Sequence, residues 1–130
     1  MNINSWKIFD EENRGSLFPI EFSDLPFQPK RIFIIKDVPK NAQRGGHAHY
    51  ETMQYLVCIK GEILVHLQYD ASKWEEITLF ENQSVLIKNM VWDWQKFKTD
   101  NDVLLVLCST SFNKSDYIED FDEFKKLQMF

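Results

Sequence analysis

Short runs rich in β-branched and aromatic residues recur along this chain, with turn residues between them. Lys60-Gly61 separates two such runs, residues 52–59 and 62–69, and predicts a tight hairpin. Residues 70–73 predict a second turn, which leads into a run at residues 74–80. A spacing of about 8–12 residues is typical of an all-β sandwich or barrel. The other expected strands cover residues 6–9, 16–22, 31–35, 84–87 and 103–108.

The end of the chain has a different pattern. From Ser115 onward the apolar positions follow helical spacing, with Ser115 or Asp116 as the expected N-cap. We expect one short C-terminal helix, docked on the barrel or on a second subunit. The chain shows no repeat, linker or change in composition, so we expect a single domain over residues 1–130.

Charge and hydropathy exclude several classes of function. The chain has 15 Lys and Arg against 20 Asp and Glu, a net charge of -5, and therefore lacks a global basic surface for nucleic acid. No apolar run approaches the roughly 18 residues of a transmembrane helix, and the N-terminus lacks a secretory pattern. Cys58 and Cys108 each lie in an apolar stretch, which is typical of buried, reduced thiols. We expect a cytoplasmic protein that binds neither nucleic acid nor membrane.

The motif most suited to chemistry is Arg-Gly-Gly-His-Ala-His at residues 44–49. In a strand, the period of two residues places His47 and His49 on the same face. The two glycines permit a positive φ or a close backbone approach just before them. Arg44 adds a planar guanidinium group suited to binding an anion.

Two histidines separated by one residue first suggest a metal site. Metal-binding barrels of the cupin class add a Glu four or five residues later and a final His from a later strand. Here Gln54 stands at the Glu position, and residues 90–94 contain no His. Two imidazoles make a weak transition-metal site, because such metals normally take three or four donors. Metal-dependent catalysis is disfavoured, and a metal-dependent cupin with an unrecognised third ligand stays an alternative.

Without a metal, the two imidazoles are free for acid–base chemistry. An imidazole with a pKa of about 6.5 can remove and return a proton at neutral pH. The alternative is that both histidines are structural and bind backbone groups or Gln54. The preceding Arg-Gly-Gly favours catalysis. The third histidine, His66, shares an alternating face with Leu64 and Gln68, and we expect it to be solvated or structurally satisfied.

Further segments occur in a fixed order along the chain: Arg14-Gly15-Ser16-Leu17, Leu25-Pro26-Phe27, Lys30-Arg31, Gln54, Val91-Trp92, Val106-Leu107-Cys108-Ser109 and Asp116-Tyr117-Ile118. With the histidine run, they make the chain resemble the dTDP-sugar 3,4-ketoisomerases, the WxcM-like cupins of bacterial unusual-sugar pathways. The resemblance extends from about Phe9 to Phe124. The histidine run together with Asp-Tyr-Ile is a specific combination, whereas either motif alone is weak.

The resemblance implies a single cupin (jelly-roll) β-barrel in an intertwined homodimer whose subunits exchange N-terminal strands. It implies conversion of dTDP-4-keto-6-deoxyglucose to the 3-keto sugar without a metal or another cofactor. An aminotransferase would use that product, and the finished 3-amino or 3-acetamido sugars would enter lipopolysaccharide O-antigen or S-layer glycans.

The resemblance also implies roles for residues. A base removes the C3 proton, which is acidic because it lies α to the C4 ketone, and a proton returns at C4. By motif match, His47 is the first candidate for this base, with His49 orienting it, relaying the proton or polarising the carbonyl. The expected substrate-binding residues, whose arginines match basic positions suited to the diphosphate, are Arg14, Arg31, Arg44, Gln54, Trp92 and Asp93.

Four positions depart from the family pattern. Phe33 stands where many members of the family have Tyr, and Tyr50 stands where a basic residue is common. Asp93 stands where some members have His or another polar residue, and Glu119 stands where Arg is usual. Phe33 and Asp93 keep a rival interpretation open, in which the protein is a non-catalytic cupin that binds a nucleotide sugar. Deuterium exchange at C3 of the sugar distinguishes the two, because a binding protein leaves that proton in place.

Overall fold

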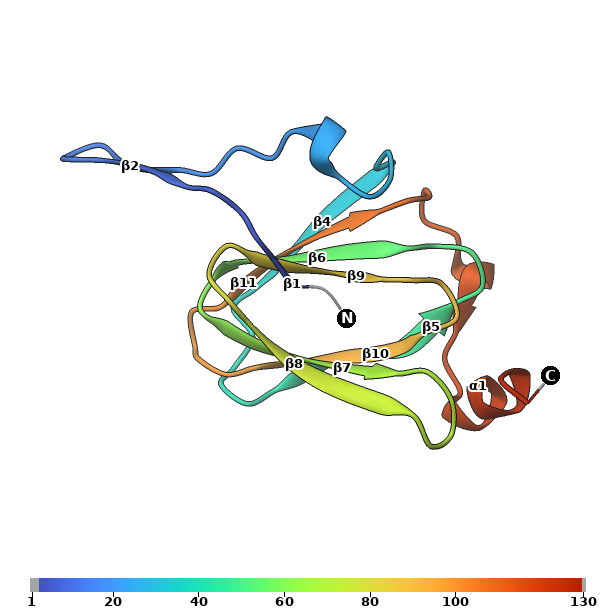
Figure 1. Ribbon diagram of the computed structural model, residues 1–130. Helices are drawn as coiled ribbons and strands as arrows, with labels where there is room; N and C mark the ends of the chain where they lie inside the picture. Colours follow the sequence, from blue (N-terminus) through green and yellow to red (C-terminus); the bar gives the residue numbers. More distant parts are fainter. Residues whose placement is uncertain (1–2, 130) are drawn as a thin grey trace.

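The computed structural model describes residues 3–129, which form two antiparallel sheets packed face to face (Figure 1). The first sheet has the strand order β1-β9-β6-β11-β4, with bounds Ile3–Ser5, Gln83–Ile87, Gln54–Lys60, Val103–Cys108 and Arg31–Lys36. The second has the order β12-β5-β10-β7-β8, with bounds Tyr117–Ile118, Gln43–His49, Trp92–Phe97, Glu62–Gln68 and Trp74–Phe80. This arrangement confirms the predicted all-β barrel.

The core lies between the sheets because alternate residues of each strand point inward. On β7, for example, Ile63, Val65 and Leu67 are fully buried. Cys58 and Cys108 also lie in this core as free thiols, as predicted. Burial raises the pKa of the Cys58 thiol to about 12, so it is protonated and unreactive at neutral pH.

The predicted hairpin at Lys60-Gly61 is confirmed between β6 and β7. Gly61 has a φ of +92°, and a Cβ there would collide with the carboxylate of Asp102. That carboxylate accepts hydrogen bonds from the backbone N–H groups of Glu62 and Thr99, at 2.9 and 2.8 Å. The buried aspartate therefore holds the turn from the neighbouring loop.

The N-terminal segment differs from the expectation of strands at residues 6–9 and 16–22. The structure has a short hairpin instead, β2 (Phe9–Glu11) and β3 (Gly15–Leu17), followed by a 3-10 turn at Phe22–Asp24. The flanking side chains of Trp6 and Ile20 pack on the outer face of the first sheet. These residues are apolar because they cover a sheet, which explains why they resemble strand residues.

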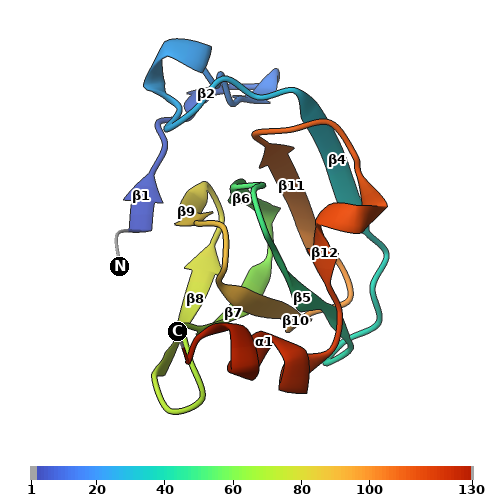
Figure 2. The same ribbon diagram turned by 90° about the vertical axis from the view of Figure 1, so that its right-hand side faces the viewer.

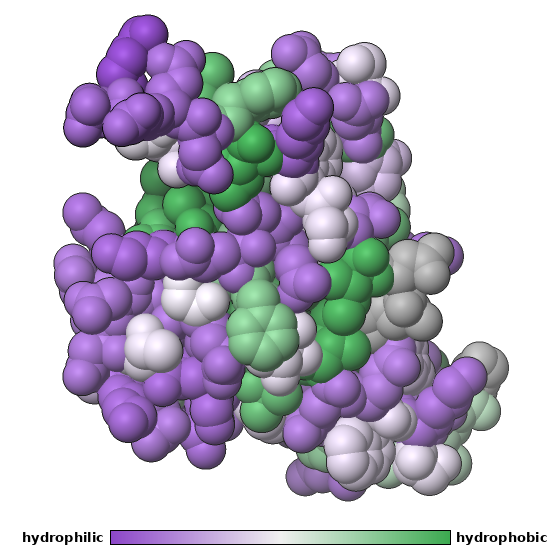
Figure 3. Space-filling view, turned by 60° about the vertical axis from the view of Figure 1, so that its left-hand side comes forward, coloured by the Kyte–Doolittle hydropathy of each residue, from purple (hydrophilic) through white to green (hydrophobic). Residues whose placement is uncertain are grey.

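The β2–β3 hairpin projects away from the barrel at the end of an extended arm (Figure 1). Its apolar side chains have little cover: Phe9 is 46% exposed and Leu17 is 65% exposed. Hydrophobic surface also lies beside the hydrophilic part of the arm on this side of the molecule (Figure 3).

The C-terminal helix is present, but it begins later than predicted. A 3-10 turn covers Lys114–Asp116, and β12 follows; α1 covers only Phe121–Leu127. Its N-cap is Asp120, whose side chain accepts a hydrogen bond from the backbone N–H of Asp122. Phe124 of α1 is fully buried against Trp92 and Ala48. Figure 2 shows α1 next to β5 and β10. Among residues 3–129, no helix is long and apolar enough to cross a membrane.

Candidate functional site

A β-bulge in β5 positions the residues of the predicted motif. Asp93 of β10 pairs with His47, whereas the next residue, Trp94, pairs with Gly45. Gly46 is therefore an extra residue without a partner on β10. Both glycines have a φ of +89°, which is strained for any residue with a side chain. The positive φ that the sequence predicted here is confirmed.

The bulge changes which side chains share a face. Arg44 and His47 are three residues apart, so a regular strand would place them on opposite faces. The extra residue brings both to one cavity, of about 320 Å³, between β4, β5, β10 and β11. Arg44 is exposed at the rim of this cavity, and His47 is half-buried in it.

The two histidines form one cluster with Tyr117. The imidazole rings of His47 and His49 are 5.1 Å apart between centroids and nearly perpendicular. The Tyr117 ring lies 5.0 Å from the first and 4.4 Å from the second. Tyr117 reaches them because β12 pairs with the end of β5, directly opposite His49. The shared face predicted for the histidines is confirmed, whereas no site role was predicted for Tyr117.

Asp116 fixes the loop that joins these elements. Its carboxylate accepts hydrogen bonds from the backbone N–H groups of Glu51 and Thr52, at 2.8 and 3.2 Å. The Thr52 hydroxyl donates to the same carboxylate at 2.5 Å. The segment after His49 is thus tied to the segment before β12, which holds Tyr117 against the histidines.

Burial keeps both imidazoles neutral. It lowers the pKa of His49 to about 4, and the nearby His47 lowers it further, against the opposing charge of Asp116. Burial also lowers the pKa of His47, against the opposing charge of Glu119. At neutral pH each ring therefore has a free lone pair that can accept a proton.

Asp93 occupies an unusual position in the same cavity. It is 1% exposed, and its Oδ1 accepts a hydrogen bond of 2.6 Å from Gln95 Nε2. Its Oδ2 has no hydrogen-bond partner in the described part of the chain. Burial raises the pKa of Asp93 to about 7, against the lowering effect of Gln95.

The remaining predicted substrate-binding residues divide into two groups. Arg31 and Gln54 line the cavity with Arg44 and Asp93, and they also line a small pocket beside His49. The Arg31 guanidinium is stacked over the rings of Phe33 and Phe112, at 4.8 and 5.0 Å, so its orientation is restricted.

Arg14 and Trp92 lie outside the cavity in this chain. Arg14 is in the projecting hairpin, where its guanidinium forms an exposed ion pair of 2.8 Å with Glu11. Trp92 is next to Asp93 in β10, so alternation sends its side chain to the opposite face. There it packs beneath α1, against Phe124.

His66 has a structural environment, as expected. Its ring nitrogens hydrogen-bond to Glu76 Oε2 and Gln68 Oε1, at 2.8 and 2.7 Å. Its ring is stacked between the indoles of Trp74 and Trp94. It does not line the cavity that contains His47.

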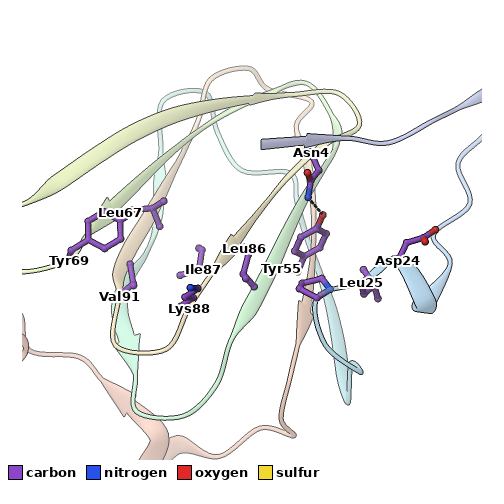
Figure 4. Close-up of a pocket in the computed structure, with 11 residues that line it drawn as sticks. Asn4, Asp24, Leu25, Tyr55, Leu67, Tyr69, Leu86, Ile87, Lys88 and Val91 are labelled. Carbon is purple, nitrogen blue, oxygen red and sulfur yellow. Dashed lines mark hydrogen bonds between the residues drawn. The ribbon is translucent and has the colours of Figure 1, made fainter. Parts of the chain in front are cut away.

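A larger cavity, of about 530 Å³, lies between the N-terminal segment and strands β6, β7 and β9 (Figure 4). Its polar lining includes Asn4, whose side-chain N–H donates to the Tyr55 hydroxyl at 3.1 Å. No histidine lines it, and no predicted site residue does. The smaller cavity is therefore the candidate site, because it combines a neutral base, cationic groups and a buried carboxyl group.

The donor set around this cavity also bears on the metal alternative. Within residues 3–129, no three His, Cys, Asp or Glu side chains lie close enough together to hold a metal ion. The groups present are suited to moving a proton on a bound anion: imidazoles for the proton and guanidinium groups for the negative charge.

Comparison with known proteins identifies the family of this chain. The family described as FdtA (WxcM-like, C-terminal) matches residues 1–129. The chain belongs to this family. It is 37% identical over 126 residues to the TDP-4-oxo-6-deoxy-alpha-D-glucose-3,4-oxoisomerase of Aneurinibacillus thermoaerophilus, covering 95% of this chain and 88% of the relative.

Solved structures of sugar 3,4-ketoisomerases share this fold. The sugar 3,4-ketoisomerase QdtA from Thermoanaerobacterium thermosaccharolyticum, in complex with TDP, has a TM-score of 0.88 and 30% identity, over 98% of this chain and 93% of its own. A His-to-Asn variant of QdtA, in complex with TDP-4-keto-6-deoxyglucose, has a TM-score of 0.87 and 29% identity, over 98% of this chain and 92% of its own. The resemblance found in the sequence is confirmed.

Proposed function

We propose that this protein is an isomerase, a metal-independent dTDP-sugar 3,4-ketoisomerase that converts dTDP-4-keto-6-deoxyglucose to a 3-keto sugar. The observation that carries the proposal is the neutral imidazole of His47 in a cavity lined by two arginines, beside the neutral imidazole of His49, in a chain of the WxcM-like family. The activity of the relative from Aneurinibacillus and the TDP-sugar complex of QdtA support the substrate class.

The proposed reaction moves one hydrogen from C3 to C4 of the sugar. An imidazole of the histidine pair removes the C3 proton, and the electron pair delocalises onto the C4 oxygen to give an enediolate. The protonated imidazole returns the proton at C4, and the hydroxyl proton of O3 passes to the C4 oxygen, which leaves a carbonyl at C3 and a hydroxyl at C4. His47 is the first candidate for this base because it lines the larger cavity, and its pKa is lowered without the deep burial of His49.

His49 then orients the base or polarises the carbonyl oxygen. It is 4% exposed, and its ring packs against the rings of both His47 and Tyr117, so it has little freedom to move. A rigid neutral imidazole can donate one hydrogen bond to a developing oxyanion without reorganising.

The test is NMR of dTDP-4-keto-6-deoxyglucose in deuterated buffer, with and without the protein. We expect a new 3-keto species with deuterium at C4. An unchanged spectrum, with binding confirmed by titration, would support the non-catalytic rival. Conversion that stops when a chelator is added would support the metal-dependent alternative.

Arg31 and Arg44 are the proposed cationic groups for the diphosphate. We expect Arg44→Ala to weaken TDP binding about 10–100-fold, because a charge-assisted hydrogen bond contributes about 1.5–3 kcal/mol. Isothermal titration with TDP measures the effect. Lys36→Ala is the matched control. Lys36 is exposed on β4 and does not line the cavity, so this substitution removes the same charge at a distance from the site. Equal affinity in Arg44→Ala and the wild type would remove Arg44 from the diphosphate site.

We also propose a homodimer in which the N-terminal arms are exchanged. The projecting β2–β3 hairpin, with exposed Phe9 and Leu17, supports this arrangement, because an isolated two-stranded hairpin is marginal without something to pack on. In such a dimer, Arg14 of the partner subunit would approach the diphosphate. Light scattering should give twice the mass of the chain, and deletion of residues 9–17 should give monomers.

From the resemblance we also propose where the protein acts and which reaction follows. The two reduced, buried cysteines are consistent with a cytoplasmic enzyme. Its 3-keto product would be consumed by an aminotransferase that supplies amino sugars for O-antigen or S-layer glycans.

A further inference from the structure

The side chain of Phe112 is a large apolar group that the core of the barrel does not use. It lies in the loop between β11 and the 3-10 turn at Lys114–Asp116, and it is 60% exposed. It belongs to none of the apolar clusters formed by residues 3–129. A single exposed apolar side chain is ordinary by itself, so what Phe112 contacts decides whether it has a function.

Phe112 contacts the cationic group that the proposed function assigns to the diphosphate. The guanidinium carbon of Arg31 lies over the Phe112 ring, 5.0 Å from its centroid, and over the Phe33 ring at 4.8 Å. The two rings come from different elements, because Phe33 belongs to β4 and Phe112 to the loop after β11. The face of an aromatic ring attracts a cation, so both rings restrict where the guanidinium lies.

The rest of the Arg31 side chain is free to bind an anion. Within residues 3–129 no carboxylate lies within the 4.0 Å of an ion pair with Arg31. Contact with a ring face uses no oxygen or nitrogen acceptor, so the guanidinium N–H groups remain available to a ligand. Arg31 lines both the cavity that contains His47 and the small pocket beside His49, and Phe112 lines that small pocket.

We infer that Phe112 is a positioning residue, whose ring holds the Arg31 guanidinium ready to bind the diphosphate of the substrate. This inference rests on the proposed function. A long side chain loses rotamer freedom when a ligand immobilises it, and that loss weakens binding. Because the rings already restrict Arg31, less freedom is lost when the diphosphate binds.

The backbone around Phe112 is held by contacts that do not involve its ring. The Thr110 and Thr52 hydroxyl groups hydrogen-bond at 2.6 Å on one side of it. On the other side, Asn113 Oδ1 accepts a hydrogen bond of 3.1 Å from the backbone N–H of Ser115. We therefore expect variants of Phe112 to fold.

The first experiment is isothermal titration with TDP. We expect Phe112→Leu, which keeps an apolar side chain but has no ring, to bind TDP about 2–10-fold more weakly. Phe112→Trp should retain the wild-type affinity, because an indole face also binds a cation. Phe80→Leu is the matched control: Phe80 is 51% exposed on β8 and lines neither pocket of Arg31, so TDP affinity should not change.

A double-mutant cycle tests whether Phe112 acts through Arg31. Arg31→Met removes the guanidinium and should weaken TDP binding about 10–100-fold. If Phe112 only positions that group, adding Phe112→Leu to Arg31→Met should cause no further loss. Losses that multiply in the double variant would overturn the inference and show that Phe112 contacts the nucleotide itself.

Kinetics of the sugar conversion provide a readout that general damage to the loop would not reproduce. We expect Phe112→Leu to raise KM, with kcat within about 2-fold of the wild type, because the diphosphate is bound equally in the ground state and the transition state. A fall in kcat with an unchanged KM would overturn the inference. It would show that Phe112 acts on the histidines through Tyr117, whose ring lies 5.8 Å from that of Phe112.

The outcomes separate this inference from the proposed function. A wild type that binds TDP but converts no sugar would contradict the ketoisomerase, whereas the titrations would still decide the role of Phe112. Equal TDP affinity in Phe112→Leu and the wild type would overturn the role of Phe112 alone. A wild type that binds no TDP would overturn the inference together with the diphosphate site.

Discussion

His47→Asn should lose ketoisomerase activity by about 10²–10⁴-fold, the usual contribution of a general acid–base group, or by more if one imidazole serves both steps. Asparagine retains a polar side chain but has no basic nitrogen at neutral pH. Because His47 is half-buried and makes no hydrogen bond to a protein side chain in residues 3–129, we expect the fold to persist. The measurement is turnover by NMR, with circular dichroism to confirm folding.

His49→Asn provides the matched comparison, because the two variants remove the same group at neighbouring positions on one face. We expect both variants to lose turnover, but only His47→Asn to lose deuterium exchange at C3. Exchange that is lost in His49→Asn and retained in His47→Asn would interchange the two roles. Near wild-type turnover in both variants would remove the histidine pair from the mechanism.

Gly45→Ala should lower both the free energy of unfolding and the activity. A Cβ on Gly45 would lie 3.0 Å from Trp94 Cα and 3.1 Å from the Asp93 carbonyl oxygen, so the strands must separate. Overpacking of this kind costs about 1–3 kcal/mol. The positive φ adds about 1–2 kcal/mol for alanine. Since β10 carries Asp93, the same displacement changes the position of the site residues.

Gly46→Ala is the matched control, because it has the same φ of +89° but open space around its Cβ position. We expect Gly46→Ala to lower the free energy of unfolding only by the backbone strain, about 1–2 kcal/mol. Urea denaturation measures both losses. If Gly45→Ala is no less stable than Gly46→Ala, close contact between β5 and β10 is not what requires glycine at position 45.

Much of the barrel could be predicted because strands and hairpins are local patterns. Alternation placed His47 and His49 on one face, and the turn at Gly61 followed from two apolar runs separated by two residues. The patterns failed where an apolar side chain covers a surface instead of belonging to a strand. Trp6 and Ile20 pack on the first sheet from outside, and their composition does not distinguish this role from strand pairing.

The predicted start of the C-terminal helix was wrong for a related reason. Tyr117 and Ile118 match a helical apolar stripe, yet they pair with β5 as a strand, and α1 begins only after Asp120. The edge of β5 offers unpaired backbone groups to which residues 117 and 118 can hydrogen-bond. Local helix or strand propensity does not indicate that such an edge lies nearby. This pairing brings Tyr117 to the histidines, so the same event explains both the wrong boundary and the missed site residue.

The sequence by itself determined the family, the all-β class, the shared face of the two histidines and the reduced state of the thiols, because each depends on residue type and local period. Only the tertiary structure decided that Arg44 and His47 share a cavity, that Trp92 leaves it, and that Asp93 is enclosed without a cation. Those outcomes depend on the bulge and on which strands are neighbours. Both are set by contacts between residues far apart in the chain, where periodicity carries no information.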